Sequence, residues 1–263
     1  MLHNPVVLAL LGTGFTFLAT AVGAAFVFFV RRDASPNLQK GFMGFAAGVM
    51  IAASVWSLLI PAQNMAAEQG MNEWVPTTLG FLAGGIFLFI LDHLLPHLHA
   101  NENKPEGLPS GLKRTTLLVL AVTLHNIPEG MAVGLSFAVA ASGGQAALAG
   151  AIALALGMAL QNVPEGAAIS LPLHKEGVSR PKAFVLGALS GVVEPLGGLV
   201  GVLLAVTMAR LMPFMLSFAA GAMIYVVVEE LVPESSGDGQ GHAGVIGTMI
   251  GFTLMMVLDI ALG

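Results

Sequence analysis

Apolar residues along this chain gather in long runs separated by short polar stretches. Eight runs are each long enough to cross a bilayer core, which takes about 20 residues of helix. The polar stretches between them are rich in Gly, Pro, Ser, Asn or charge, which favours loops. The pattern predicts an all-α integral membrane protein, one domain over 1–263, with eight transmembrane helices at residues 5–30, 38–62, 75–98, 114–139, 146–172, 183–208, 211–233 and 243–262.

The boundary between the fourth and fifth runs is weakly marked. No charged residue lies between Glu129 and Glu165, and the only divider is "ASGGQ". We expect two helices joined by a tight turn there, because Ser and Gly favour turns. A single helix through Ser142, Gly143 and Gly144 is the alternative.

Composition supports a membrane protein and restricts its chemistry. Of the residues, 56% are hydrophobic and 10% are charged, against about 25% charged in an ordinary soluble domain. We therefore expect a lipid bilayer around the chain and no nucleic-acid partner. The absence of cysteine excludes disulfides, thiolate ligands and iron–sulfur clusters, so any bound metal must be held by nitrogen, oxygen or thioether. The first run has basic residues after it and none before it, which is typical of a spanning helix rather than a cleaved signal.

Positive charge predicts the orientation of the helices. With eight spans, nine of the ten Lys and Arg residues fall on one side of the membrane. Basic residues in short loops mark the cytoplasmic side. We therefore predict that both termini are extracytoplasmic. The nine residues are Arg31, Arg32, Lys40, Lys104, Lys113, Arg114, Lys175, Arg180 and Lys182, and Arg210 lies opposite.

Polar residues interrupt the central helices at one depth. His125 and Glu129 fall near the middle of the fourth helix, Gln161 and Glu165 near the middle of the fifth, and Glu194 near the middle of the sixth. Each charge at the bilayer centre costs about 2.5 to 3.5 kcal/mol, so a cation or protons must compensate. Residues four apart share a helix face, so each of the first two helices presents a pair of metal-ligand groups.

The two hexapeptides "HNIPEG" and "QNVPEG" also open the backbone. Pro128 and Pro164 have no N–H, so the carbonyls of Leu124 and Leu160 lose their helical donors and a bend is expected. Bent helices at membrane depth are tolerated where they line a cavity. A glycine follows each motif glutamate and allows close backbone approach.

The donor types favour a divalent transition metal. Imidazole, amide and carboxylate groups suit Zn, Mn, Fe(II), Co, Ni or Cd, and the nitrogen ligand argues against Ca and Mg. The number of bound ions remains open, because Glu129 and Glu165 could also bridge to a second ion, with Asn126, Asn162 and Glu194 completing its site. Met50, near the middle of the second helix, is by composition ordinary apolar filler, with a thioether ligand as the alternative.

A second cluster, of acids and histidines, is predicted where the third and seventh helices end on the cytoplasmic side, and Glu234 lies at similar depth. It is either a secondary metal station at the inner mouth of a pathway or a set of hydrated interfacial residues. Asp259, near the outer end of the eighth helix, lines an entrance or is a paired interfacial acid. The cluster consists of Asp92, His93, His97, His99, Glu229 and Glu230.

These motifs resemble those of the ZIP family of divalent-metal transporters, most closely its prokaryotic GufA-like branch. The resemblance rests on "HNIPEG", "QNVPEG", "SGVVEPLGG", "GFAAGVMIAAS" and "MMVLD" and covers nearly the whole chain. It implies an inverted repeat of helices 1–3 and 6–8 around a central pair, helices 4 and 5, and a binuclear site. One metal would be held by His125, Glu129, Gln161 and Glu165, with Met50 close by, and the other by Asn126, Glu129, Asn162, Glu165 and Glu194.

The chain departs from the family pattern at Asn162, where relatives often have Asp, so the second metal is the less secure. The loop between the third and fourth helices is short and offers only His97 and His99. The resemblance also implies a multi-pass protein of a prokaryotic plasma or inner membrane. A homodimer is one assembly to consider.

The functional expectation is a carrier rather than an enzyme. A divalent ion, zinc first and iron, manganese or cadmium next, would be imported as substrate by alternating access, with no catalytic cofactor. The glutamates would hold protons when the ion leaves, because ionised carboxylates so close repel each other. The alternatives are an intramembrane metal-dependent hydrolase, for which the His-Glu-x-x-His pattern is absent, and a metal-regulated receptor or scaffold. The choice between carrier and channel stays open.

Overall fold

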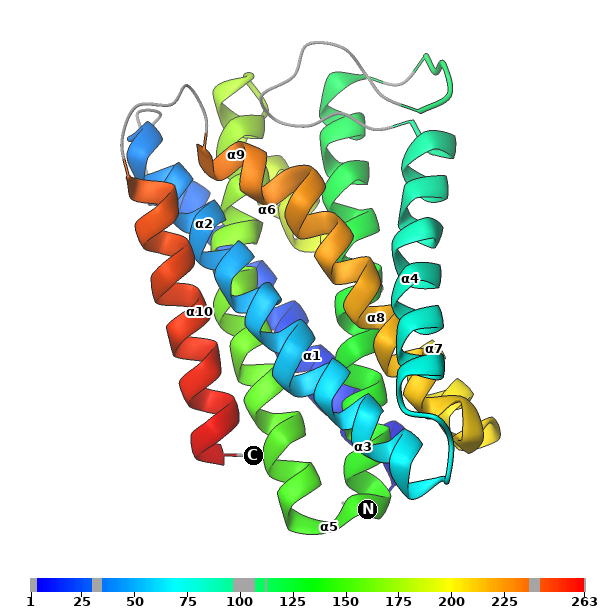
Figure 1. The fold of residues 1–263 in the computed structure, drawn as a ribbon. Coiled ribbons are helices and arrows are strands. Elements are labelled where there is room, and N and C mark those ends of the chain that lie inside the picture. The colour runs from blue at the N-terminus through cyan, green and yellow to red at the C-terminus, as the bar shows by residue number, and fades with distance from the viewer. Residues whose placement is uncertain (1–3, 30–34, 97–106, 112, 237–241, 263) are drawn as a thin grey trace.

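The computed structural model describes residues 4–29, 35–96, 107–111, 113–236 and 242–262, which are helical apart from short connections and contain no strand. Figure 1 shows the helices arranged as one elongated bundle. They are α1 (Pro5–Ala24), α2 (Pro36–Ala53), α3 (Ile60–Glu68), α4 (Trp74–Leu94), α5 (Arg114–Lys175), α6 (Arg180–Ser190), α7 (Val193–Thr207), α8 (Met212–Val226), α9 (Val232–Ser236) and α10 (Ala243–Leu262). Short 3₁₀ turns follow α1 at Ala25–Phe28 and precede α8 at Ala209–Leu211.

The described chain contains eight helical spans that are long and apolar enough to cross a membrane, which confirms the prediction of an eight-helix membrane fold. Several spans are made of two labelled helices in line, such as α2 with α3 and α6 with α7. The spans are Pro5–Phe28, Pro36–Glu68, Trp74–Leu94, Thr115–Ala141, Gly144–Lys175, Arg180–Thr207, Ala209–Ser236 and Ala243–Leu262.

Helix α5 doubles back on itself at Gly144. This residue has φ of 80° and ψ of −163°, the only non-helical dihedrals within α5, and a positive φ of this kind favours glycine. Figure 1 shows the two limbs meeting at the bottom of the view. The expected tight turn between two helices is therefore present, and the fourth and fifth spans are the first limb (Thr115–Ala141) and the second limb (Gly144–Lys175) of α5.

The helices pack as two groups. In the first group, α1, α6 and α7 all pack on α5, and α1 also packs on α6 and α7. In the second, α2 packs on α10, and α8 packs on α3 and α4. Helix α5 makes the main contacts between the groups, through α2, α8 and α10. The two limbs that carry the hexapeptides therefore lie between the two groups.

The glycines of the two hexapeptides bring helix backbones together within the first group. A Cβ at Gly130 would overlap the backbone of Glu194 in α7, and a Cβ at Gly166 would overlap the carbonyl oxygen of Thr20 in α1. Only glycine permits this approach. The residues next to these glycines are thereby held against α1 and α7.

The two ends of the chain lie on the same side of the bundle, at the bottom of Figure 1. The helix ends that carry Lys40, Lys113, Lys175, Arg180 and Lys182 lie at the top, and the turn with Arg210 lies at the bottom. Arg31, Arg32 and Lys104 lie outside the described residues. This segregation matches the predicted topology, and the assignment of the top to the cytoplasm remains a prediction from charge.

Two spans share an unusual local geometry that agrees with the expected inverted repeat. The second span contains a π-helical stretch at Ser54–Leu59, and the seventh contains one at Val227–Leu231. In each, a proline follows two residues after the stretch, at Pro61 and Pro233. The two spans run in opposite directions (Figure 1). π-helical turns are rare and occur often at functional sites.

Candidate metal centre

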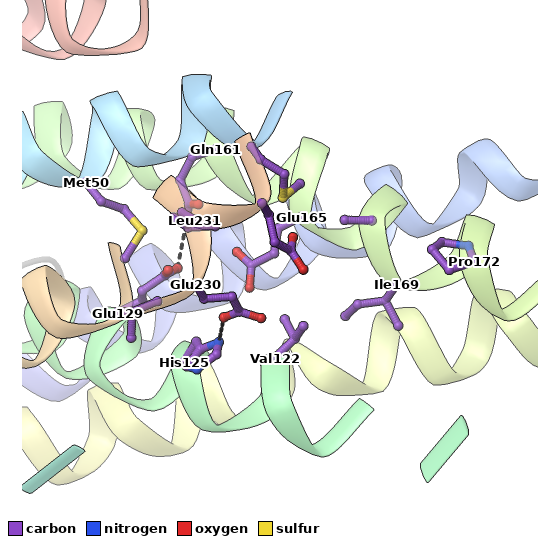
Figure 2. A pocket seen from close by; sticks show the side chains of 14 residues that line it. Met50, Val122, His125, Glu129, Gln161, Glu165, Ile169, Pro172, Glu230 and Leu231 are labelled. Atoms are coloured by element: carbon purple, nitrogen blue, oxygen red, sulfur yellow. Dashed lines mark hydrogen bonds and ion pairs between the residues drawn. The ribbon is translucent and has the colours of Figure 1, made fainter. Parts of the chain in front are cut away.

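One cavity opens at the level of the hexapeptides and extends toward the end of the bundle with the basic residues. Its walls come from α2, both limbs of α5, and the α8–α9 span, so it lies between the two groups of helices. Figure 2 shows its polar side chains pointing toward one another. The lining residues are Met43, Met50, Val122, His125, Glu129, Gln161, Glu165, Ala168, Ile169, Pro172, Val226, Glu230, Leu231 and Glu234.

Four predicted ligands line this cavity, and we call them the cavity-facing set: His125, Glu129, Gln161 and Glu165. The amide Nε2 of Gln161 donates to Oε2 of Glu129 at 2.6 Å. Oε2 of Glu165 is buried and has no hydrogen-bond partner among the described residues. A buried carboxylate oxygen without a donor is costly, so this atom marks a place for a proton or a cation.

The imidazole of His125 makes an ion pair with Glu230 of the π-helical stretch (Figure 2). Both side chains are buried. Sequence reasoning assigned Glu230 to the cluster at the cytoplasmic helix ends, whereas here it closes the cavity against the central histidine. An ion that uses His125 as a ligand must displace this ion pair.

Met50 is fully buried and lines the same cavity. Figure 2 shows its side chain directed toward the space between Glu129 and Gln161. Its thioether is therefore placed where a soft ligand could approach an ion, although the same position suits apolar filling.

The other three predicted ligands do not line the cavity, and we call them the seam-facing set: Asn126, Asn162 and Glu194. Asn162 Nδ2 donates to the carbonyl oxygen of Thr16 at 3.2 Å and to Oε2 of Glu194 at 2.9 Å. Oε1 of Glu194 accepts from the Thr20 hydroxyl at 3.0 Å. These contacts tie the second limb of α5 to α1 and α7.

Asn126 completes this set on the first limb of α5. Its Nδ2 donates to the carbonyl oxygen of Ser190 at 3.0 Å, at the end of α6. Its Oδ1 is buried and has no hydrogen-bond partner among the described residues. Asn126 therefore fixes the break between α6 and α7 and keeps one acceptor open.

The hexapeptide prolines sit inside regular helix. Helical dihedrals continue through Pro128 and Pro164, since Gly144 alone departs from them within α5. Each proline nevertheless leaves the carbonyl four residues earlier without its usual N–H donor. Leu124 is buried near the cavity, and Leu160 is exposed at the surface of the bundle.

The residues predicted at the cytoplasmic helix ends do not gather into one site in the described part of the chain. Asp92 is buried and accepts from the Tyr225 hydroxyl at 3.3 Å. His93 is exposed, with Nδ1 2.9 Å from the carbonyl oxygen of Phe89, and Glu229 is exposed. Glu234 joins Glu230 in lining the cavity. His97 and His99 lie outside the described residues, so the exit-site prediction stays a prediction.

A second cavity lies nearer the end of the bundle with the chain termini. Asp259 of α10 lines it and accepts from the Ser57 hydroxyl at 2.6 Å, while its Oδ2 is buried without a partner among the described residues. Asp259 is thus a hydrogen-bonded acid that also lines a cavity, and its place at an entrance stays a prediction. The remaining lining residues are Trp56, Pro61, Ser136, Val139, Ala146, Ala147, Gly150, Ala151 and Leu216.

Within the described residues, no group of three or more His, Asp and Glu side chains is assembled to hold a metal ion. The cavity-facing set has one His and two Glu, but His125 is turned to Glu230. An ion that takes His125 as a ligand therefore requires this side chain to move away from Glu230.

Sequence reasoning missed the contribution of α1. Thr20 and the backbone of Thr16 hold Glu194 and Asn162, yet α1 has no charged residue to draw attention to it. The available signal was the spacing of three buried threonines, Thr13, Thr16 and Thr20, on one face of an otherwise apolar helix. Tyr225, which donates to Asp92, and Ser57, which donates to Asp259, were also missed, because each partner lies on a different helix from the acid.

Comparisons with known proteins agree with the motifs. The family model described as ZIP zinc transporter matches residues 108–259. Zinc transporter ZIP11 of Homo sapiens is 38% identical over 99% of this chain and 99% of its own length. Zinc transporter ZIPB of Bordetella bronchiseptica is 38% identical over 97% of this chain and 81% of its own. Zinc transporter GufA of Myxococcus xanthus is 40% identical over 93% of this chain and 95% of its own. The similarity thus reaches both eukaryotic and bacterial proteins and spans the whole helical bundle.

Proposed function

Because the chain belongs to the ZIP zinc transporter family, we propose that it imports a divalent transition metal ion into the cytoplasm through the cavity between the limbs of α5. Zinc is the first candidate, since the relatives are named zinc transporters, and iron, manganese and cadmium share the ligand preferences. The observation that carries the proposal is the buried, unpartnered Oε2 of Glu165 beside Glu129 and His125.

The cavity supplies ligands suited to such an ion. Two carboxylates, one imidazole and one amide give hard and borderline donors, with the Met50 thioether beside them, and this mixture fits first-row divalent ions. The ion loses its water to these side chains, and its charge offsets the cost of burying carboxylates at membrane depth. The glutamates take up protons once the ion leaves.

The separation of the two cavities supports a carrier. Among the described residues, none lines both the cavity at Glu165 and the cavity at Asp259. In the proposed cycle, passage from one to the other accompanies movement of the helices. The first group of helices, joined backbone to backbone at Gly130 and Gly166, moves as a unit past the second group in an alternating-access cycle.

The charge of the loops supports an orientation for the proposed pathway. With the basic end of the bundle in the cytoplasm, the cavity at Asp259 is the outer entrance and the cavity at Glu165 opens inward past Glu234. Exit runs past Glu230 and the acids and histidines at the ends of α4 and α9. The eight apolar spans and the relatives' names as transporters support a multi-pass membrane protein, and we propose the cell membrane as its location.

The test is metal uptake into proteoliposomes that contain the purified full-length chain. The Glu129→Ala and Glu165→Ala variants are expected to lose zinc uptake, and Glu68→Ala, which removes an exposed acid on α3, to keep it. A panel of metals under an imposed pH gradient reports selectivity and proton coupling in the same assay. Full uptake by both cavity variants would contradict the proposal, as would metal-dependent hydrolysis without ion flux.

A further inference from the structure

We propose that Asn162 is a positioning residue that links Glu194 to Gln161 in a hydrogen-bond relay, so that the central site of this chain holds one ion, with the Gln161 carbonyl oxygen as its ligand. The inference deepens the proposed function and rests on it. It concerns the residues of the seam-facing set, which the resemblance had placed around a second metal.

The orientation of the Asn162 amide is dictated by its surroundings. Its nitrogen lies 3.2 Å from the carbonyl oxygen of Thr16 and 2.9 Å from Oε2 of Glu194. A backbone carbonyl can only accept hydrogen bonds, so the amide nitrogen must face it whatever the protonation of Glu194. The Asn162 oxygen is therefore turned to the opposite side, toward Gln161.

The orientation of Gln161 follows from that of Asn162. Gln161 Nε2 donates both to Asn162 Oδ1 and to Glu129 Oε2. Both partners present acceptor oxygens, so the nitrogen of Gln161 is fixed between them. The carbonyl oxygen is the amide atom outside these two bonds, and it is also the only amide atom with lone pairs for a cation. Gln161 lines the cavity, so the relay determines which end of its amide an ion meets.

Glu194 is held by bonds that leave it away from the cavity. It is 1% exposed, and its two carboxylate oxygens accept from the Thr20 hydroxyl and the Asn162 amide. It also lies in the first turn of α7, directly after the break in the sixth span, where the N-terminal end of a helix stabilises negative charge. Both carboxylate oxygens of this glutamate are therefore already engaged by protein donors.

A carboxylate at position 162 would change this arrangement. An oxygen in place of Nδ2 would face the carbonyl of Thr16 and the carboxylate of Glu194, and three acceptors would meet without a hydrogen. A cation between them would relieve that repulsion, and in this chain the Asn162 N–H groups take that role. Asn126 Oδ1 is the only side-chain polar atom of the seam-facing set without a hydrogen-bond partner among the described residues. Of the three ligands that this set would give to a second ion, only one thus keeps an open acceptor, and the side chains of the other two are engaged with each other and with α1.

The first experiment counts zinc ions bound to the full-length chain in detergent by equilibrium dialysis. The number of central-site ions is the number of zinc ions bound by the wild type minus the number bound by the Glu129→Ala/Glu165→Ala double variant. This subtraction removes any ions that histidines elsewhere bind. We expect a difference of one ion for the wild type. The Asn162→Asp variant is expected to gain a second, and the matched Asn64→Asp variant, at an exposed position on α3, to gain none.

A difference of two ions in the wild type would overturn the relay and leave the proposed function standing. A difference of zero, together with unchanged uptake by the double variant, would instead remove the proposed function. These two failures are thus distinguishable in one data set.

The second experiment tests positioning rather than folding. Asn162→Ala removes both ends of the relay, and the zinc dissociation constant is expected to rise about tenfold, the usual effect of losing a partner that orients a ligand. In transport the same change appears in KM with little effect on kcat. Thr20→Val is expected to shift KM in the same direction, and Thr20→Ser to restore it. Unchanged affinity in folded Asn162→Ala protein would overturn the positioning role, and thermal unfolding in detergent checks that each variant is folded.

Discussion

The cavity-facing and seam-facing sets lie at the same depth, and adjacent residues of the same hexapeptides contribute to both. His125 and Gln161 line the cavity, whereas Asn126 and Asn162, the next residues along the chain, point into the packing between α5, α6, α7 and α1. Consecutive residues of a helix lie about 100° apart around its axis. The rotation of each limb therefore separates groups that can hold an ion from groups that hold the helices together.

The difference between the sets is one of hydrogen-bond partners rather than burial. Glu165 and Glu194 are both buried at 8% exposure or less. Glu194 has a donor for each oxygen, whereas Glu165 Oε2 has none among the described residues. Burial thus does not distinguish the two glutamates, whereas the unpartnered oxygen of Glu165 does.

The largest expected effect separates these two glutamates. Replacing either by Gln removes one charge at the same depth with almost no change in volume. We expect Glu165→Gln to lower kcat/KM for zinc uptake by about 100-fold or more, which is about 2.7 kcal/mol, because in the proposed site it removes a direct ligand.

The Glu194→Gln variant is expected to lose less than about tenfold, since the Thr16 carbonyl still orients Asn162. Its main change is a lower thermal stability in detergent, because a neutral amide oxygen accepts a weaker hydrogen bond from Asn162 than a carboxylate oxygen does. Equal losses of uptake in both variants would abolish the distinction between the two sets.

The next largest effect concerns the close packing of α1 on α5 beside the seam-facing set. A Cβ at Gly23 of α1 would overlap the backbone carbonyl of Val163, next to Asn162, while a Cβ at Gly14 of the same helix meets nothing within 4 Å. We expect Gly23→Ala to destabilise the protein by about 2 kcal/mol through overpacking and Gly14→Ala to be neutral or stabilising. Thermal unfolding followed by tryptophan fluorescence distinguishes them, and similar melting temperatures would show that the seam is not tight.

The smallest expected effect is at the cavity that Asp259 lines. The Ser57→Ala variant leaves Asp259 without its hydroxyl donor but keeps its charge. We expect KM for external zinc to change by less than about tenfold, since a single hydrogen bond contributes about 1 kcal/mol, and kcat to stay unchanged. The Ser236→Ala variant, at an exposed serine of α9, is the control. A large loss of kcat in Ser57→Ala would place this pair in the transport step instead.

Much of the fold was predictable because it depends on length and composition. Each span is a run of apolar residues between polar dividers, and "ASGGQ" marked the turn that Gly144 makes with a positive φ. The depth of Glu129, Glu165 and Glu194 also followed from counting residues along the helices. Their presence in the central helices needed no tertiary information.

The partners of these residues were not predictable, because they depend on how helices rotate and pack. Counting along the seventh span placed Glu230 at the helix end, but the π-helical stretch and the tilt of α8 bring it to His125. From the sequence, Asn162 was interpreted as a weakened metal ligand. Its hydrogen bond to the Thr16 carbonyl could not be predicted, because that bond depends on where α1 packs. The local sequence pattern predicts how deep in the bundle a residue lies, but it does not predict which residues of other helices contact it.

The central claim is that the ion binds to the cavity-facing set and not to the seam-facing set. Anomalous diffraction at the zinc absorption edge from zinc-loaded crystals of the full-length chain tests it most directly. We expect one central peak at about 2.0 to 2.2 Å from carboxylate oxygens of Glu129 and Glu165, with the imidazole of His125 turned away from Glu230 toward the ion. A central peak coordinated by Asn162 and Glu194, or no peak in the cavity, would contradict the claim.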